Sequence, residues 1–141
     1  MSSITAELYV EVQTFFAKQM RLLDNLKIED YAATFTPDGE IVHAHRNERA
    51  QGRETMIAGM YAALPRYKGV VVRHWFDHLL VEPAADGSLI VNYYTLVTRC
   101  DAEGKVVFEP TFTVTDTLVR GEDGQLYTKL RYIEKDTPPQ P

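Results

Sequence analysis

Apolar residues in the first quarter of the chain recur with helical spacing. Between residues 5 and 24 they lie three or four positions apart and form one stripe of an amphipathic helix, made of Leu8, Val12, Phe15, Phe16, Met20 and Leu23. Two more helices are predicted over residues 28–35 and 53–64, the latter ended by Pro65. Between them we expect a turn over 36–39, a short strand over 40–45 and a polar loop over 46–52.

The second half of the chain has the pattern of a β-sheet. Four β-rich runs, over residues 70–82, 88–100, 105–119 and 126–135, are separated by short glycine-containing turns. Such turns favour an antiparallel meander against which the helices bury their apolar stripes. We predict a single α+β domain over residues 1–136 and a disordered proline-rich tail over residues 137–141.

Composition limits the classes of function. The chain has 141 residues, of which 45% are hydrophobic and 25% charged, as expected for one globular domain. Its net charge of -5 argues against a nucleic-acid partner. No apolar run approaches the roughly 20 residues that span a bilayer, and the N-terminus does not resemble a signal peptide. We therefore expect no membrane association and a cytoplasmic location. The single cysteine, Cys100, allows no internal disulfide and no thiolate zinc site.

The residue that most suggests chemistry is His74. In a regular strand it shares one face with Val72, Phe76 and Leu80, so that an ionisable ring lies within an apolar stripe. A histidine in this setting is either a catalytic base or a core residue with satisfied hydrogen bonds. The residues by themselves leave both interpretations open.

Two further histidines, His43 and His45, lie two positions apart. On a strand they share a face, as metal ligands or paired acid-base groups would. The simpler alternative places His45 in a polar strand that leads into a solvated loop.

An acidic residue interrupts the apolar face of the strand that begins at Phe112. Asp116 alternates there with Phe112, Val114 and Leu118. An unpaired carboxylate in that position would be costly, so it must meet a cation or line a wet pocket. The candidate partners are Arg99 and Arg131.

Two short motifs stand out along the chain: the segment Ile-Glu-Asp-Tyr-Ala-Ala-Thr-Phe-Thr-Pro-Asp-Gly-Glu-Ile over residues 28–41 and the pair Arg73-His74. Together with the order of elements, they resemble the SnoaL-like family of the nuclear transport factor 2-like superfamily. The resemblance implies a cone-shaped α+β barrel, with three N-terminal helices packed in a curved antiparallel sheet and a pocket at the open end.

The resemblance also implies a set of site residues. Asp24 and His74 are similar to a catalytic pair in which the carboxylate orients the imidazole, although Asp24 can also be a solvated residue at a helix end. His43 lies near the position of a pocket tyrosine and would hydrogen-bond the developing oxyanion together with Tyr93 or Tyr94, which point to opposite faces. The other expected substrate-binding residues are Phe112, Asp116 and Arg99.

We therefore expect a general acid-base enzyme that uses no cofactor or metal. It would act as a cyclase, dehydratase or isomerase on an apolar, carbonyl-bearing secondary metabolite of the polyketide type. One alternative is a non-catalytic small-molecule binding or assembly subunit of the same fold, and another is a metal enzyme built on His43 and His45. The resemblance further implies a homodimer formed through the sheet faces.

Overall fold

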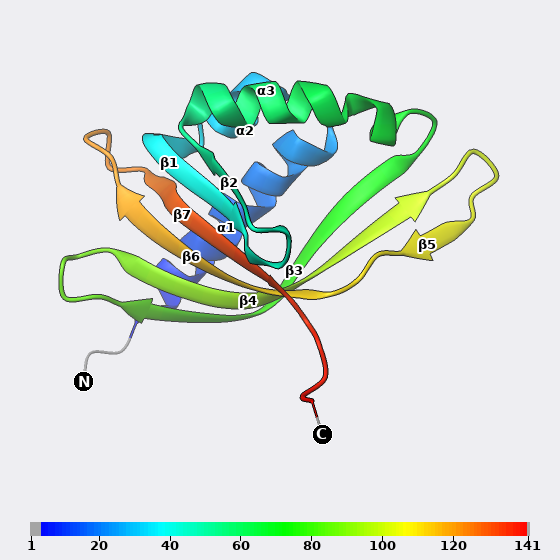
Figure 1. The fold of residues 1–141 in the computed structure, drawn as a ribbon. Helices are drawn as coiled ribbons and strands as arrows, with labels where there is room; N and C mark the ends of the chain where they lie inside the picture. The colour runs from blue at the N-terminus through cyan, green and yellow to red at the C-terminus, as the bar shows by residue number, and fades with distance from the viewer. Residues whose placement is uncertain (1–3, 141) are drawn as a thin grey trace.

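The computed structural model describes residues 4–140 and begins with the predicted long helix (Figure 1). Helix α1 (Ala6–Asp24) starts where the Thr5 hydroxyl accepts a hydrogen bond from the Leu8 N–H at 3.0 Å, as an N-cap does. It is followed by α2 (Ile28–Ala32), the 3-10 turn η1 (Ala44–Arg46), α3 (Arg53–Ala63) and a second 3-10 turn, η2 (Leu64–Tyr67). No helix in this part of the chain is long and apolar enough to cross a membrane.

Seven strands form one curved sheet. They are β1 (Phe35–His43), β2 (Glu48–Gln51), β3 (Val71–Pro83), β4 (Leu89–Cys100), β5 (Val106–Phe108), β6 (Phe112–Arg120) and β7 (Leu126–Lys135). Their order is β2-β1-β7-β6-β4-β3, with β5 paired to β4 beside this path. All pairs are antiparallel except β1 with β7, which is parallel.

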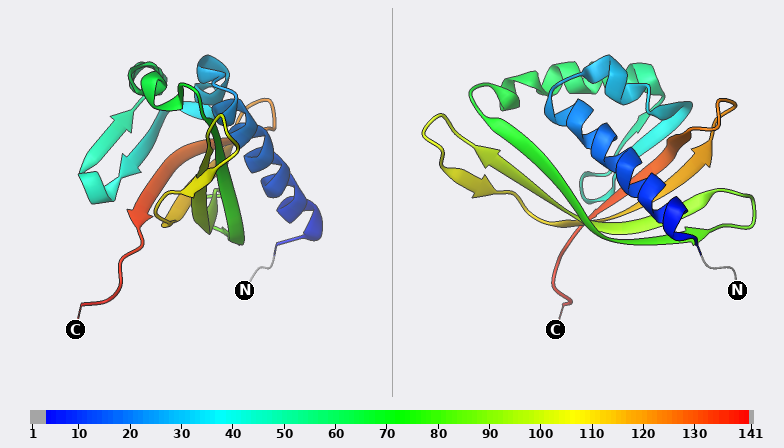
Figure 2. Two further views of the ribbon diagram at one scale, coloured as in Figure 1. Left: turned by 90° about the vertical axis from the view of Figure 1, so that its right-hand side faces the viewer. Right: turned by 180° about the vertical axis from the view of Figure 1, so that it is seen from behind.

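The helices cover the concave face of the sheet. Seen from behind, α1 crosses the strands diagonally, while α3 lies along the upper edge (Figure 2). The main core lies under α1, where Val12 and Phe16 pack against Val91, Tyr93 and residues of the neighbouring strands. A second buried cluster joins the end of α1 to α2 and α3 through Met20, Tyr31, Phe35 and Met56.

The predicted α+β class, with three N-terminal helices packed on a curved sheet, is confirmed. The sheet is mixed rather than wholly antiparallel, and its ends do not meet to close a barrel. Several predicted boundaries were wrong. The second helix ends at Ala32, the predicted turn over residues 36–39 belongs to β1, and the predicted loop over 46–52 contains β2. The predicted strand over 105–119 is two strands, because residues 109–111 interrupt the pairing.

A β-bulge in β3 makes one part of the His74 prediction wrong, namely that Leu80 shares the face of His74. The register with β4 shifts between Asp77 and Leu80, and His78 adopts a positive φ of 57°. The shift inverts the alternation, so that Leu79 is buried and Leu80 is 64% exposed. His74 therefore shares its inward face with Val72 and Phe76, but not with Leu80.

Candidate functional site

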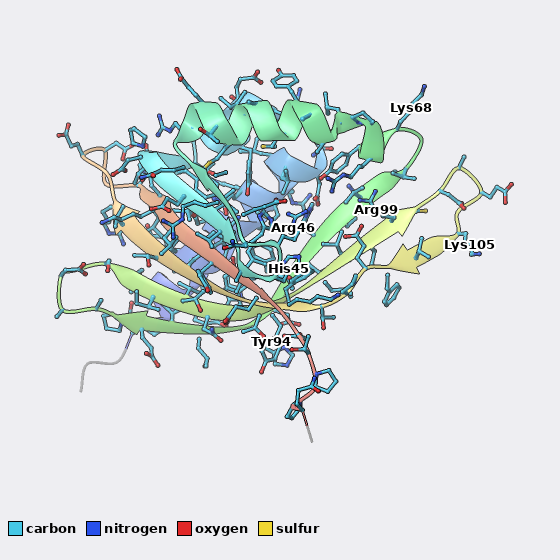
Figure 3. The ribbon with its side chains drawn as sticks, viewed as in Figure 1. His45, Arg46, Lys68, Tyr94, Arg99 and Lys105 are labelled. Atoms are coloured by element: carbon cyan, nitrogen blue, oxygen red, sulfur yellow. The ribbon has the colours of Figure 1, made fainter. Side chains whose placement is uncertain are left out.

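A cavity of about 930 Å³ lies between the helices, the β1–β2 hairpin and the inner face of the sheet. This volume is within the range of small-molecule sites. The buried end is lined mainly by apolar or aromatic residues such as Met20, Met56 and Val72. The mouth is polar, and Figure 3 shows His45, Arg46 and Arg99 at the opening.

His74 lines this cavity and meets Asp24 behind it, although fifty positions separate the two residues in the chain. The Asp24 Oδ1 atom lies 2.7 Å from the Nδ1 atom of His74 and accepts the His74 backbone N–H at 3.2 Å. Their side chains are only 8% and 19% exposed, respectively. A carboxylate at the end of α1 is disfavoured by the helix dipole, and the two bonds to His74 compensate for that position.

This contact fixes which ring nitrogen of His74 is available for chemistry. A carboxylate can only accept a hydrogen bond, so the Nδ1 atom of His74 carries a proton. In the neutral ring the Nε2 atom then holds the free lone pair. Because His74 lines the cavity, it can present a base to a bound molecule.

His43 lines the same cavity at the end of β1, whereas His45 lies in η1 rather than on the expected strand. Burial, reinforced by the positive charge of Arg46 and by His45, lowers the pKa of His43 to about 4. His43 is therefore neutral near pH 7 and can donate one N–H hydrogen bond. Within residues 4–140, no group of three or more His, Cys, Asp or Glu side chains is placed to hold a metal ion.

Asp116 pairs with Arg131 and not with Arg99. The Arg131 guanidinium donates to both Asp116 oxygens, at 3.0 and 2.8 Å, and both side chains are almost fully buried. The Tyr93 hydroxyl donates to Asp116 Oδ1 at 2.8 Å. Arg131 also donates to the Tyr31 hydroxyl at 3.0 Å, so the network extends to the cavity wall. The expectation that Asp116 binds substrate is therefore wrong, because its carboxylate is completely buried and hydrogen-bonded to Arg131 and Tyr93.

Neither of the two candidate tyrosines lines the cavity. Tyr93 points inward but is completely buried, with its phenol bonded to Asp116. Tyr94 lies on the outer face, 53% exposed and beside His78, and Figure 3 shows it directed away from the cavity. The expectation that one of these phenols faces the pocket is therefore wrong. Tyr93 is held in the core network with Asp116, and Tyr94 points outward because side chains alternate along a strand.

Phe112 and Arg99 do line the cavity, as expected. The Phe112 ring lies 5.1 Å from the ring of His45 near the opening. Arg99 donates to Glu109 at 2.5 Å and to the backbone carbonyl of Arg66 at 2.7 Å.

Two tyrosines that the sequence analysis does not single out, Tyr31 and Tyr67, also line the cavity. Burial raises the pKa of both phenols, so both stay protonated near pH 7. Within the described chain the Tyr67 hydroxyl makes no hydrogen bond, and the Tyr31 hydroxyl proton has no acceptor. Helical spacing from Ile28 indicates that Tyr31 faces inward, but no sequence signal marks Tyr67.

Comparisons with known proteins agree with this architecture. A sequence model described as "SnoaL-like domain" matches residues 5–131. No protein with a curated functional description matches the chain. The structure of Aln2 from a Streptomyces species is similar, with 42% identity, coverage of 96% of this chain and 95% of that one, and a TM-score of 0.89.

Two other solved structures extend the comparison. ActVI-ORFA from Streptomyces coelicolor is 37% identical, with 93% of this chain and 98% of that chain covered and a TM-score of 0.88. A protein from Catenulispora acidiphila, solved in complex with S-DNPA, is 40% identical, with 94% and 96% covered and a TM-score of 0.85. The matched domain, which spans nearly the whole chain, shows that this protein belongs to the SnoaL-like family.

Proposed function

We propose that this protein is a general acid-base enzyme that acts on an apolar, carbonyl-bearing molecule of the polyketide type. The observation that carries the proposal is the 2.7 Å contact between Asp24 and His74, whose ring lines a large, mostly apolar cavity. A binding or assembly subunit would have no need for this pairing. The similar Catenulispora acidiphila protein, solved in complex with S-DNPA, supports a small-molecule ligand for the cavity.

The chemistry begins with removal of a proton from the carbon next to the carbonyl group. The Nε2 atom of His74 takes this proton, and the resulting imidazolium is stabilised by the Asp24 carboxylate at Nδ1. The electron pair left on carbon moves to the carbonyl oxygen and gives an enolate. Apolar walls lower the local dielectric and strengthen the attraction between these charges.

The enolate oxygen needs hydrogen-bond donors, and the cavity offers neutral ones. His43 has an N–H donor near pH 7, while Tyr31 and Tyr67 remain protonated phenols because burial raises their pKa. The imidazolium can then return its proton to another carbon, which is isomerisation. It can instead protonate a departing hydroxide, which is dehydration. In cyclisation the enolate carbon attacks a second carbonyl, and the alkoxide that forms takes the proton from the imidazolium.

Exchange of hydrogen for deuterium tests this function without knowledge of the natural substrate. We expect the protein to accelerate exchange at the acidic carbon of 2-tetralone in D₂O, followed by NMR. Replacement of His74 by Ala should lower the catalysed rate by about 10²- to 10⁴-fold, the usual contribution of an acid-base group. A His74→Ala protein that is folded and as active as wild type would contradict the proposal, as would a wild-type protein without any catalysed exchange.

A homodimer is the second part of the proposal. Large apolar side chains are exposed on the outer face of the sheet, opposite the cavity: Val71, Trp75, Leu80, Tyr94 and Tyr132. A second copy that packs on this face would remove them from water. Light scattering coupled to size-exclusion chromatography tests it, and a monomeric mass at micromolar concentration would refute it.

A further inference from the structure

Positive side chains predominate around the cavity, although the chain as a whole carries a net charge of -5. Only two carboxylate side chains in the described chain, Glu48 and Glu109, line the cavity. The cationic lining residues are Arg46, Arg49, Arg66, Arg99, Arg131 and Lys135. A cleft lined by one sign of charge concentrates ligands of the opposite sign.

Carboxylates neutralise four of these six cations. Arg131 pairs with Asp116, Arg99 with Glu109, Arg46 with Glu48 and Arg49 with Glu40. Arg66 and Lys135 have no carboxylate within 4.0 Å among residues 4–140. Two positive charges at the cavity therefore remain available to a ligand.

The unpaired charges lie at the mouth rather than at the base of the cavity. Arg66 and Lys135 are exposed, whereas the His74 side chain is only 19% exposed. Arg66 is held close to Arg99, because its backbone carbonyl accepts the Arg99 guanidinium at 2.7 Å. Arg99 itself lies at the opening (Figure 3). A ligand that satisfies both regions is apolar at one end and anionic at the other.

We propose that the substrate carries a carboxylate, which the charges of Arg66 and Lys135 attract to the mouth while the apolar, carbonyl-bearing body lies beside His74. This inference rests on the proposed function in taking the same cavity as the substrate site. The anchored carboxylate would align the molecule, so that one particular carbon faces the His74 imidazole. A neutral molecule of the same shape lacks that anchor.

A matched pair of probes separates charge from shape. We expect 2-naphthylacetate to bind wild-type protein about tenfold more tightly than 2-naphthylacetamide at low ionic strength, measured by isothermal titration calorimetry. The preference should fall below about threefold in about 1 M salt, where the Debye length is about 3 Å. Equal affinity for the two probes, or no measurable binding of the acid, would overturn the inference.

Two double variants with the same net charge locate the anchor. Arg66→Gln/Lys135→Gln should reduce the preference for the acid to about twofold. Lys68→Gln/Lys105→Gln removes two cations that point away from the cavity and should keep the preference near tenfold (Figure 3). An equal loss of preference in both double variants would mean that only the overall charge matters, and would overturn the inference. Single Arg66→Gln and Lys135→Gln variants provide a second measurement if the double variant does not fold.

The binding test does not depend on turnover. If the protein prefers the acid but catalyses no exchange on 2-tetralone, the anion site is supported and the proposed catalytic function is contradicted. If exchange depends on His74 but the acid and the amide bind equally well, the proposed function is supported and the anion site is contradicted.

Discussion

Replacement of Asp24 by Asn removes one negative charge and almost no volume. In the wild type, Asp24 Oδ1 accepts both the Nδ1 proton and the backbone N–H of His74. The Asn side-chain oxygen can accept the same two bonds, so the cavity should keep its shape. What disappears is the attraction between the carboxylate and the imidazolium that forms during the reaction.

The size of that attraction follows from the geometry. Two unit charges about 4 Å apart attract by about 4 kcal/mol at an effective dielectric constant of about 20, which suits a partly buried pair. The Asn dipole retains part of this, which leaves a loss of about 3 kcal/mol. Since about 1.4 kcal/mol corresponds to a tenfold change in rate, kcat/KM should fall by about 10²-fold.

The assay is exchange at 2-tetralone by NMR, with thermal unfolding recorded in parallel. Asp30→Asn serves as the matched control, because Asp30 is an exposed residue of α2 that does not line the cavity, and its activity should equal that of wild type. An Asp24→Asn protein that is folded and within threefold of wild type would show that the charge of Asp24 does not assist His74.

Three other predictions concern stability and assembly. The free energy of unfolding should decline as pH falls from about 6.5 to about 4, because His43 takes up a proton in the unfolded protein but not in the folded one. With solvent screening the decline is about 1–2 kcal/mol. A His43→Gln protein that shows an equal decline in urea denaturation would contradict this prediction. Asp116→Ala should cost about 3–5 kcal/mol in urea denaturation, because it leaves Arg131 charged and buried. Glu11→Gln, which breaks an exposed pair with Arg120, should cost less than about 1 kcal/mol, and equal costs would refute the distinction. Trp75→Glu should convert a dimer to a monomer in light scattering, and a dimer of unchanged affinity would exclude the outer face.

Local patterns predicted the helices and the strand-rich half of the chain well. The stripe of α1 and the alternation of β6 depend on residues close in sequence, and both are present. The bulge at His78 could not be predicted in this way, because no glycine marks its positive φ and its position depends on how the two flanking stretches of β3 pair with β4. The same holds for β2, whose polar residues form a strand only because β1 provides a partner.

The parts of the site that follow from the order of elements could be predicted from the sequence. The parts that depend on how strands pack against each other could not. Asp24 at a helix end and His74 on a strand could be matched by their order, and the structure brings them together. The choice of Arg131 over Arg99 as partner of Asp116 depends on the register of β6 with β7, which places Asp116 and Arg131 opposite each other. The pattern of residues within either strand does not determine that register.

The central position of β7 has a consequence for how the protein is made. The strand order places β7 between β1 and β6, so the β1–β2 hairpin joins the rest of the sheet only through the last strand of the chain. While residues 126–135 are still inside the ribosome, His43 and the arginines of that hairpin have no sheet to attach to. The cavity therefore closes only after β7 has left the ribosome, and a chain truncated before β7 would expose two unpaired strand edges that favour aggregation.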